Sequence, residues 1–222
     1  MTTNHPTAIL LFSRTAEAEA QAKSFGAGAV GDVRIATELI RCTERMLNRA
    51  GLPVIRADES RQRGRDFGTR LATAMTEAFA LGYENLLVVG NDAPDLTVGH
   101  LQRASQSLAA GVNVVVPDRR GGIALLGICR EDFAPAALTS LAWETDALRE
   151  ELLQIIPNAQ LMSAVRDINA LADLRLEWSR LRSRLGRLAH LLVENILVFA
   201  GRSATPARLL LSTVVRGPPV WR

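Results

Sequence analysis

Short apolar runs alternate with longer amphipathic runs between residues 7 and 156, and this alternation limits the fold more than any other feature of the sequence. The runs typical of buried strands are residues 7–13, 53–57, 86–90, 113–117 and 123–128. The runs with apolar side chains at helical spacing are residues 30–50, 67–81, 97–110 and 146–156. Strands that alternate with helices of this length predict an α/β fold, with a mainly parallel, Rossmann-like sheet and helices on both faces.

The charge of the chain changes sign near residue 175. Residues 175–222 hold nine arginines and two glutamates, whereas the preceding 174 residues hold 17 basic and 21 acidic side chains. Apolar residues of the C-terminal part recur at helical spacing, with arginines on the opposite face. We therefore expect an α/β domain at residues 1–174 and a basic amphipathic helical extension at residues 175–222. The extension either packs on the domain or makes peripheral contact with an anionic membrane.

Several classes of protein are not favoured by the sequence. The net charge of +3 is too small to predict a nucleic-acid partner. The two cysteines, Cys42 and Cys129, lie in apolar stretches without the spacing of a zinc site. The sequence begins without the pattern of a secretory signal, and no apolar run is long enough to span a bilayer. We expect a cytoplasmic protein, and the sequence leaves its oligomeric state open.

An acidic loop follows the apolar run at residues 86–90. Ligands of open α/β sheets bind where strands end at their carboxyl edge. Asp92 and Asp95 therefore stand where a hard cation such as Mg²⁺ or Mn²⁺ would meet substrate phosphates. The competing interpretation is that one of them caps the helix starting near Thr97. Asp95 is the better candidate for a cap and Asp92 for a metal ligand.

A second loop joins the runs at residues 113–117 and 123–128. Gly121 and Gly122 allow backbone N–H groups to turn toward a phosphate, and Arg120 could hold a diphosphate. The competing interpretation is a simple hairpin turn, because paired glycines are common there.

Two further segments carry candidate phosphate or base ligands. Ser13 and Arg14 follow the first apolar run, and Lys23, the only lysine of the chain, comes shortly afterwards. Residues 62–70 precede a helix and hold two glycines among polar residues, which indicates a weak phosphate or base loop; its candidates are Gln62, Asp66 and Arg70. The sequence has neither the glycine pattern of dinucleotide-binding folds nor that of a P-loop.

Several motifs together resemble a glycosyltransferase-A-like family of bacterial proteins of unknown function. This family is related to 2-phospholactate guanylyltransferase and to nucleotide-diphospho-sugar transferases. The residues that carry the resemblance span roughly residues 7–174: Phe12, Ser13, Arg14 and Lys23; Gln62, Gly64, Asp66, Phe67, Gly68, Arg70 and Leu71; Gly90, Asp92, Pro94, Leu96 and Thr97; Pro117, Arg120, Gly121, Gly122, Leu126 and Gly127; Trp143 and Thr145; and Asp167, Ile168 and Asn169.

The resemblance implies a glycosyltransferase-A fold with a nucleotide bound in the N-terminal half. It also implies that Asp92 is a ligand of a divalent metal or of the diphosphate, and that Asp167 supplies the second metal ligand. The sequence departs from the family pattern in four places. Arg120 replaces an Asp, Ile123 and Ala124 replace an aromatic pair, Asn169 replaces the last Asp of the late acidic motif, and a Lys-Thr-Arg-Leu stretch is reduced to residues 23–26.

Three functions follow from these residues. The leading one is a glycosyltransferase that binds a nucleotide-sugar through Mg²⁺ or Mn²⁺ and transfers the sugar to an unknown acceptor, with Asp95 as base or as ligand of a sugar hydroxyl. The second is a nucleotidyltransferase that joins an NTP to a phosphorylated acceptor. The third is a non-catalytic nucleotide-binding or scaffold protein, which the charge inversion at Arg120 motivates.

Overall fold

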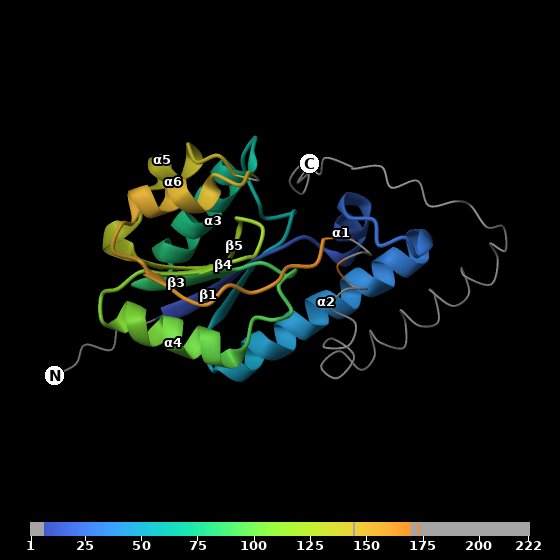
Figure 1. The fold of residues 1–222 in the computed structure, drawn as a ribbon, viewed down its shortest axis with the longest axis horizontal. Helices are drawn as coiled ribbons and strands as arrows, with labels where there is room; N and C mark the ends of the chain where they lie inside the picture. Colours follow the sequence, from blue (N-terminus) through green and yellow to red (C-terminus); the bar gives the residue numbers. More distant parts are fainter. Residues whose placement is uncertain (1–6, 144, 170–172, 174–222) are drawn as a thin grey trace.

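The computed structural model describes residues 7–143, 145–169 and 173 of the chain. In this part a six-stranded sheet lies between two layers of helices (Figure 1). The predicted extension at residues 175–222 lies outside the described residues. Within them, no helix combines the length and the apolar character that crossing a membrane requires.

The sheet is mainly parallel, as the alternation of runs predicts. Its strands are β1 (Thr7–Phe12), β2 (Val54–Ala57), β3 (Asn85–Val89), β4 (Val114–Pro117), β5 (Ile123–Cys129) and β6 (Gln160–Leu161). They are arranged in the order β2-β1-β3-β5-β4-β6, and β5 alone runs antiparallel to its neighbours. Because β4 and β5 form a hairpin, the hairpin interpretation of residues 117–122 is correct.

Helices cover both faces of the sheet. They are α1 (Ala16–Ala22), α2 (Gly28–Ala50), α3 (Phe67–Ala80), α4 (Val98–Ala109), α5 (Pro135–Thr139) and α6 (Leu148–Ile155), with a 3₁₀ turn at Arg130–Asp132. Helices α3, α5 and α6 lie on one face, and α2 and α4 lie on the other (Figure 1). Because both faces are covered, β1 and β3 are buried along their whole length and contain few polar residues.

The local signals that end and begin helices agree with the structure, with one exception. Gly51 ends α2 in a left-handed conformation with φ of 72°, which glycine adopts without steric cost. Thr97 caps α4: its hydroxyl accepts from the His100 N–H while the His100 ring accepts from the Thr97 N–H. The prediction that Asp95 is the better cap is therefore wrong, because the cap lies two residues further along.

A small third core lies apart from the two cores that flank the sheet. Phe25, Ile35, Ala36, Leu39 and Ile168 bury their side chains together between α1, α2 and the segment of residues 165–169. We call this segment the strap. Ile168 thus fixes the strap to the α1–α2 pair, on the side of the sheet where the strands end.

Candidate functional site

The register of the sheet brings the predicted loops to one edge. Leu11 of β1 lies opposite Val89 of β3, so the residues that follow these two strands, Ser13 and Asp92 among them, leave the sheet on the same side. The end of β4 lies at this edge too, because β4 runs parallel to β1 and β3. This is the carboxyl edge, where open α/β sheets bind their ligands.

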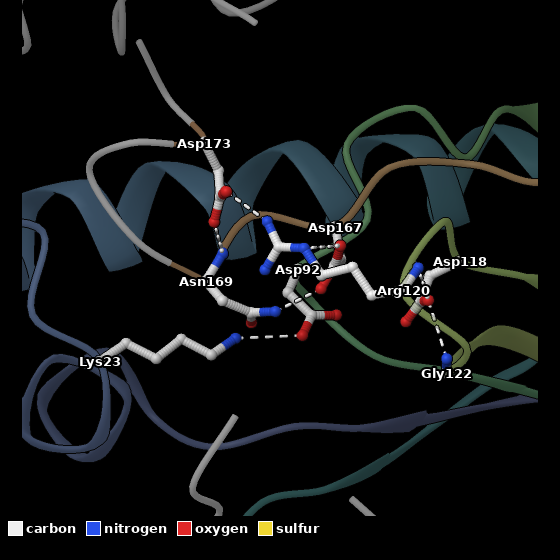
Figure 2. Close-up of polar contacts among 8 residues, drawn as sticks. All are labelled: Lys23, Asp92, Asp118, Arg120, Gly122, Asp167, Asn169 and Asp173. Carbon is white, nitrogen blue, oxygen red and sulfur yellow. Dashed lines mark hydrogen bonds and ion pairs between the residues drawn. The ribbon is translucent and has the colours of Figure 1, made fainter. Parts of the chain in front are cut away.

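Lys23 and Asp92 form an ion pair at this edge. Lys23 is 7% exposed, and its Nζ lies 3.0 Å from Asp92 Oδ2 and 2.8 Å from Glu19 Oε1. Burial alone would lower the pKa of Lys23, but the charges of Asp92 and Glu19 together raise that pKa above its ordinary value. Lys23 is therefore a fixed positive charge beside the predicted metal ligand (Figure 2).

The strap crosses the carboxyl edge and adds acidic side chains to it. The Val165 N–H donates to the Pro117 carbonyl at 3.0 Å, and the Ile168 N–H donates to the Asp92 carbonyl at 2.7 Å. These bonds connect the strap to the ends of β4 and β3. Because Ile168 is buried in the small core, Asp167 on one side of it is held next to the Asp92 loop.

Arg120 reaches from the β4–β5 loop to the strap. Its Nε lies 3.7 Å from Asp167 Oδ1, and its Nη2 hydrogen-bonds to Asp173 Oδ1. Figure 2 shows the guanidinium extending over the site toward these two carboxylates. The charge inversion seen in the sequence thus has a structural counterpart, since Arg120 is paired with acids from the late acidic segment.

Asp118 holds the β4–β5 loop in shape. Its Oδ1 accepts from the backbone N–H groups of Arg120 at 2.7 Å and Gly122 at 2.8 Å. A Cβ on Gly122 would lie 2.2 Å from Asp118 Oδ2, and Gly121 has φ of 96°. The loop therefore needs both glycines, but the Gly122 N–H that was predicted to meet a phosphate already donates to Asp118.

The pKa of Asp167 is raised in spite of its ion pair with Arg120. Burial raises its pKa to about 6, the charge of Asp118 adds to the increase, Arg120 opposes it and Asp92 adds to it again. The side-chain oxygen of Asn169 is buried and has no hydrogen-bond partner among the described residues, although its amide nitrogen donates to Asp167.

A divalent cation fits these residues as a site with few protein ligands. No three acidic, histidine or cysteine side chains of the described part lie close enough together to hold a metal by themselves. Mg²⁺ commonly takes one or two carboxylates and completes its shell with water and substrate phosphates. Asp92 and Asp167, with the unsatisfied oxygen of Asn169 nearby, suit that mode of binding.

The remaining predicted ligands differ in burial and in their hydrogen bonds. Gln62 donates from Nε2 to the carbonyls of Ser13 and Ala57 at 2.8 and 2.9 Å, so it ties the ends of β1 and β2 together. Asp66 is exposed and caps α3 through the Thr69 N–H, a bond that holds the pKa of Asp66 below its usual range. Arg70 is half-buried, and its Nε has no hydrogen-bond partner among the described residues.

Arg14 and Asp95 are both half-buried. Arg14 follows Ser13 at the carboxyl edge, where the end of β1 places it. Asp95 stands near the start of α4. Burial lowers the pKa of His100, Arg103 lowers it further, and the charge of Asp95 opposes both.

Reasoning from the sequence missed three residues of the site. Glu19 pairs with Lys23 and is 2% exposed, and a spacing of four residues would have indicated the pair if α1 had been predicted. Asp118 could have been predicted, because an aspartate at the start of a turn often accepts hydrogen bonds from the backbone of that turn. Asp173 carries no signal in the sequence, because its partner Arg120 is 53 residues away.

Comparisons with known proteins agree with the fold. Residues 41–145 match a family described as "uncharacterized protein conserved in bacteria (DUF2064)". The structure is similar to that of a candidate nucleotide-diphospho-sugar transferase from Desulfovibrio desulfuricans G20, with a TM-score of 0.76 and 18% identity, over 88% of this chain and 97% of that one. No curated protein matches the chain.

Two other solved structures are more distant. Rv0371c from Mycobacterium tuberculosis H37Rv has a TM-score of 0.43 and 14% identity, over 77% of this chain and 97% of that one. A CMP:2-keto-3-deoxy-manno-octonic acid synthetase complexed with CTP has a TM-score of 0.41 and 10% identity, over 80% of this chain and 99% of that one. These two similarities are too low to carry an argument.

The resemblance predicted from the motifs is confirmed: residues 41–145 have the sequence pattern of the DUF2064 family, and the chain has the fold of a candidate nucleotide-diphospho-sugar transferase.

Proposed function

We propose that this protein is a transferase that binds a nucleotide-sugar together with a divalent cation and transfers the sugar to an acceptor. The observation that carries the proposal is the pairing of Lys23 with Asp92 and of Arg120 with Asp167 at the carboxyl edge of the sheet. Cations placed beside carboxylates suit a diphosphate that binds together with a divalent metal. The fold shared with the Desulfovibrio protein agrees with this class of substrate.

The charge of each residue of the site indicates which part of the substrate or cofactor it would bind. Arg14, Lys23 and Arg120 are the cations that would bind phosphate oxygens. Asp92 and Asp167 would hold Mg²⁺ or Mn²⁺, and the metal, when bound, would offset the charge of the diphosphate leaving group. Asp95 is left as the candidate base or ligand of a sugar hydroxyl.

The nucleotide would lie against the loops that follow β1 and β2. Ser13 and Gln62 already form one hydrogen-bonded unit there, and the unsatisfied Nε of half-buried Arg70 is available to a phosphate or a base. Asp66 would act mainly by fixing the start of α3 beside these loops. The backbone of Gly121 and Gly122 would shape the opposite wall.

Binding and product analysis test the proposal. Thermal-shift measurements with a panel of nucleotides and nucleotide-sugars, with and without Mn²⁺, should show at least one ligand whose stabilisation needs the metal. Asp92→Asn should weaken that ligand by at least about tenfold, whereas Glu77→Gln, at an exposed position on α3, should leave it unchanged. Equal affinity of the Asp92→Asn protein and the unaltered protein would exclude the assignment.

The product separates the enzymatic alternatives. Release of a nucleoside diphosphate from a nucleotide-sugar identifies a glycosyltransferase, whereas release of pyrophosphate from an NTP identifies a nucleotidyltransferase. Binding without either product would identify a non-catalytic nucleotide-binding protein, the alternative that Arg120 favours because it already engages Asp167 and Asp173.

We also propose that residues 175–222 bring the domain to an anionic membrane and thereby to a lipid-linked acceptor. Their nine arginines and two glutamates supply the charge that such contact needs. Sedimentation with vesicles that contain phosphatidylserine should retain the intact chain more than a chain that ends at residue 174. Equal sedimentation of the two would exclude membrane contact through this segment.

A further inference from the structure

We propose that Arg120 and the divalent cation compete for Asp167, and that the cation, by taking Asp167, releases Arg120 to bind a phosphate. This inference rests on the proposed function and adds a regulatory link to it. Metal and phosphate would then each strengthen the binding of the other, and the free protein would bind metal weakly.

The burial of the partners shows which of them can move. The side chains of Asp167 and Asp173 are 11% and 6% exposed, whereas that of Arg120 is 43% exposed. Asp167 is further held by Asn169, whose amide donates to it, and by the neighbouring Ile168 in the small core. The carboxylates are therefore fixed, and the guanidinium lies on the open side of the site.

The contact between Arg120 and Asp167 is weak enough to exchange. Its N···O distance of 3.7 Å is longer than a hydrogen bond and leaves mainly the attraction of the charges. Arg120 also contacts Asp173, so its single charge is shared between two carboxylates. A divalent ion carries twice the charge and has a stronger attraction for the same carboxylate.

The backbone of the loop permits a side-chain movement without unfolding. The Arg120 N–H donates to Asp118 Oδ1 at 2.7 Å, and the Gly122 N–H donates to the same oxygen, so the loop keeps its shape when the guanidinium leaves. Figure 2 shows the long Arg120 side chain spanning the site from that loop. Its displacement would carry a positive charge from the strap to the space where phosphates would lie.

Competition for one carboxylate makes a quantitative prediction. Without phosphate, Arg120 lowers metal affinity, because the metal must displace it and remain near a positive charge. With metal bound, Arg120 loses its contact with Asp167, and it can exchange its remaining contact with Asp173 for a charge-assisted bond to a phosphate. Loss of Arg120 therefore changes the two affinities in opposite directions, whereas a merely structural Arg120 would leave both unchanged or weaken both.

The test uses the full chain, the variant Arg120→Gln and the control Arg119→Gln, which removes the same charge from the exposed neighbouring position. Calorimetry with Mn²⁺ alone should give about three- to tenfold tighter binding for Arg120→Gln and no more than about a twofold change for Arg119→Gln. Calorimetry with preformed magnesium pyrophosphate should give binding to Arg120→Gln that is weaker by about fivefold or more.

Each outcome decides the proposal. Equal Mn²⁺ affinity of the unaltered and Arg120→Gln proteins, or a change of both affinities in the same direction, overturns it, as does absence of Mn²⁺ binding from both proteins. Tighter Mn²⁺ binding by Arg120→Gln, in a protein that binds no nucleotide-sugar or NTP, supports the competition while the proposed function fails. If Arg120→Gln does not fold, Arg120→Met takes its place, with the same directions expected because methionine likewise removes the charge.

Discussion

At the scale of single residues, the site depends on Lys23. It is the only lysine of the chain, and it lies buried between Glu19 and Asp92. A buried carboxylate without a counter-charge destabilises the folded state. Lys23 therefore stabilises the fold, and it also places a positive charge where a phosphate would bind. Together, Glu19 of α1 and Lys23 at the end of α1 thereby hold Asp92 in the loop after β3.

Replacing Lys23 by Met should lower the free energy of unfolding by about 3 kcal/mol, because two carboxylates lose their cation. Urea denaturation measures the loss. Adding Glu19→Gln to Lys23→Met should restore at least about 1 kcal/mol of the free energy of unfolding. Glu19 is the more buried of the two carboxylates that lose Lys23, and the substitution removes its charge. Strict additivity of the two substitutions would contradict this account of Lys23.

Asp167→Asn should stabilise the protein at neutral pH. The pKa of Asp167 is raised to about 6, above its usual value of 3.8, so its ionisation opposes folding. This cost is absent below about pH 4 and fully present above about pH 6; after allowance for screening it amounts to about 1 kcal/mol at pH 7.

Melting temperatures between pH 4 and pH 7, without added metal, test this expectation. The advantage of Asp167→Asn over the unaltered protein should grow through this interval, whereas Glu77→Gln, at an exposed position, should show no such trend. An advantage that shrinks as the pH rises would show that Asp167 is stabilised as a carboxylate.

At the scale of elements, hydrophobic periodicity predicted nearly the whole sheet and the longer helices. It did not predict α1, because in Ala16–Ala22 alanine alternates with polar residues and forms no apolar stripe. The helix forms nevertheless, since Ala, Glu and Gln favour helices and the Thr15 hydroxyl accepts from the Ala18 N–H. The two-residue β6 is too short to leave any periodicity.

The candidate site was predictable only in part for a related reason. Position after a strand identified Asp92 and the loop of Arg120, because the carboxyl edge is a property of the fold. The contact of Arg120 with Asp173 depends on how the strap crosses the sheet ends, and nothing in the local sequence encodes that crossing. A contact between residues this far apart in the sequence can therefore be found only in the folded structure.

Gly122→Ala should disrupt the β4–β5 loop. Its methyl group would lie 2.2 Å from Asp118 Oδ2 and would displace the carboxylate that accepts two backbone N–H groups. We expect a loss of about 1–3 kcal/mol in the free energy of unfolding, measured by chemical denaturation, together with loss of ligand binding.

Gly99→Ala provides the matched control for that substitution. Gly99 lies in α4, and a Cβ there meets only side-chain atoms at 3.5 Å or more. Alanine should leave stability unchanged or raise it by up to about 1 kcal/mol, because it favours a helix more than glycine does. Equal effects of the two substitutions would contradict the tight packing assigned to Gly122.

At the scale of the whole molecule, the strap joins parts that are far apart in the sequence. Its Val165 bonds to the end of β4, its Ile168 bonds to the Asp92 loop, and the Ile168 side chain enters the core of α1 and α2. The strap therefore connects the α1–α2 pair to the ends of β3 and β4 at the site. Local loss of its anchor should loosen one side of the protein more than the other.

Ile168→Ala should cost about 2–4 kcal/mol and raise amide hydrogen exchange in residues 16–50 more than in residues 67–80. Leu152→Ala, a truncation of similar size in the core on the other face of the sheet, should give the reverse pattern. Hydrogen-exchange mass spectrometry resolves these segments. The same pattern for both variants would mean that the strap has no separate role in holding α1 and α2.

The position of Lys23 also makes chemical labelling informative. Apart from any terminal amine, the chain offers acylating reagents only this one amine, and the folded protein shields it. Its modification therefore requires that the site open, so the rate of labelling reports that opening directly. Ligands that close the site should slow the reaction, and cross-linkers directed at lysine should fail to join the folded chain to its neighbours.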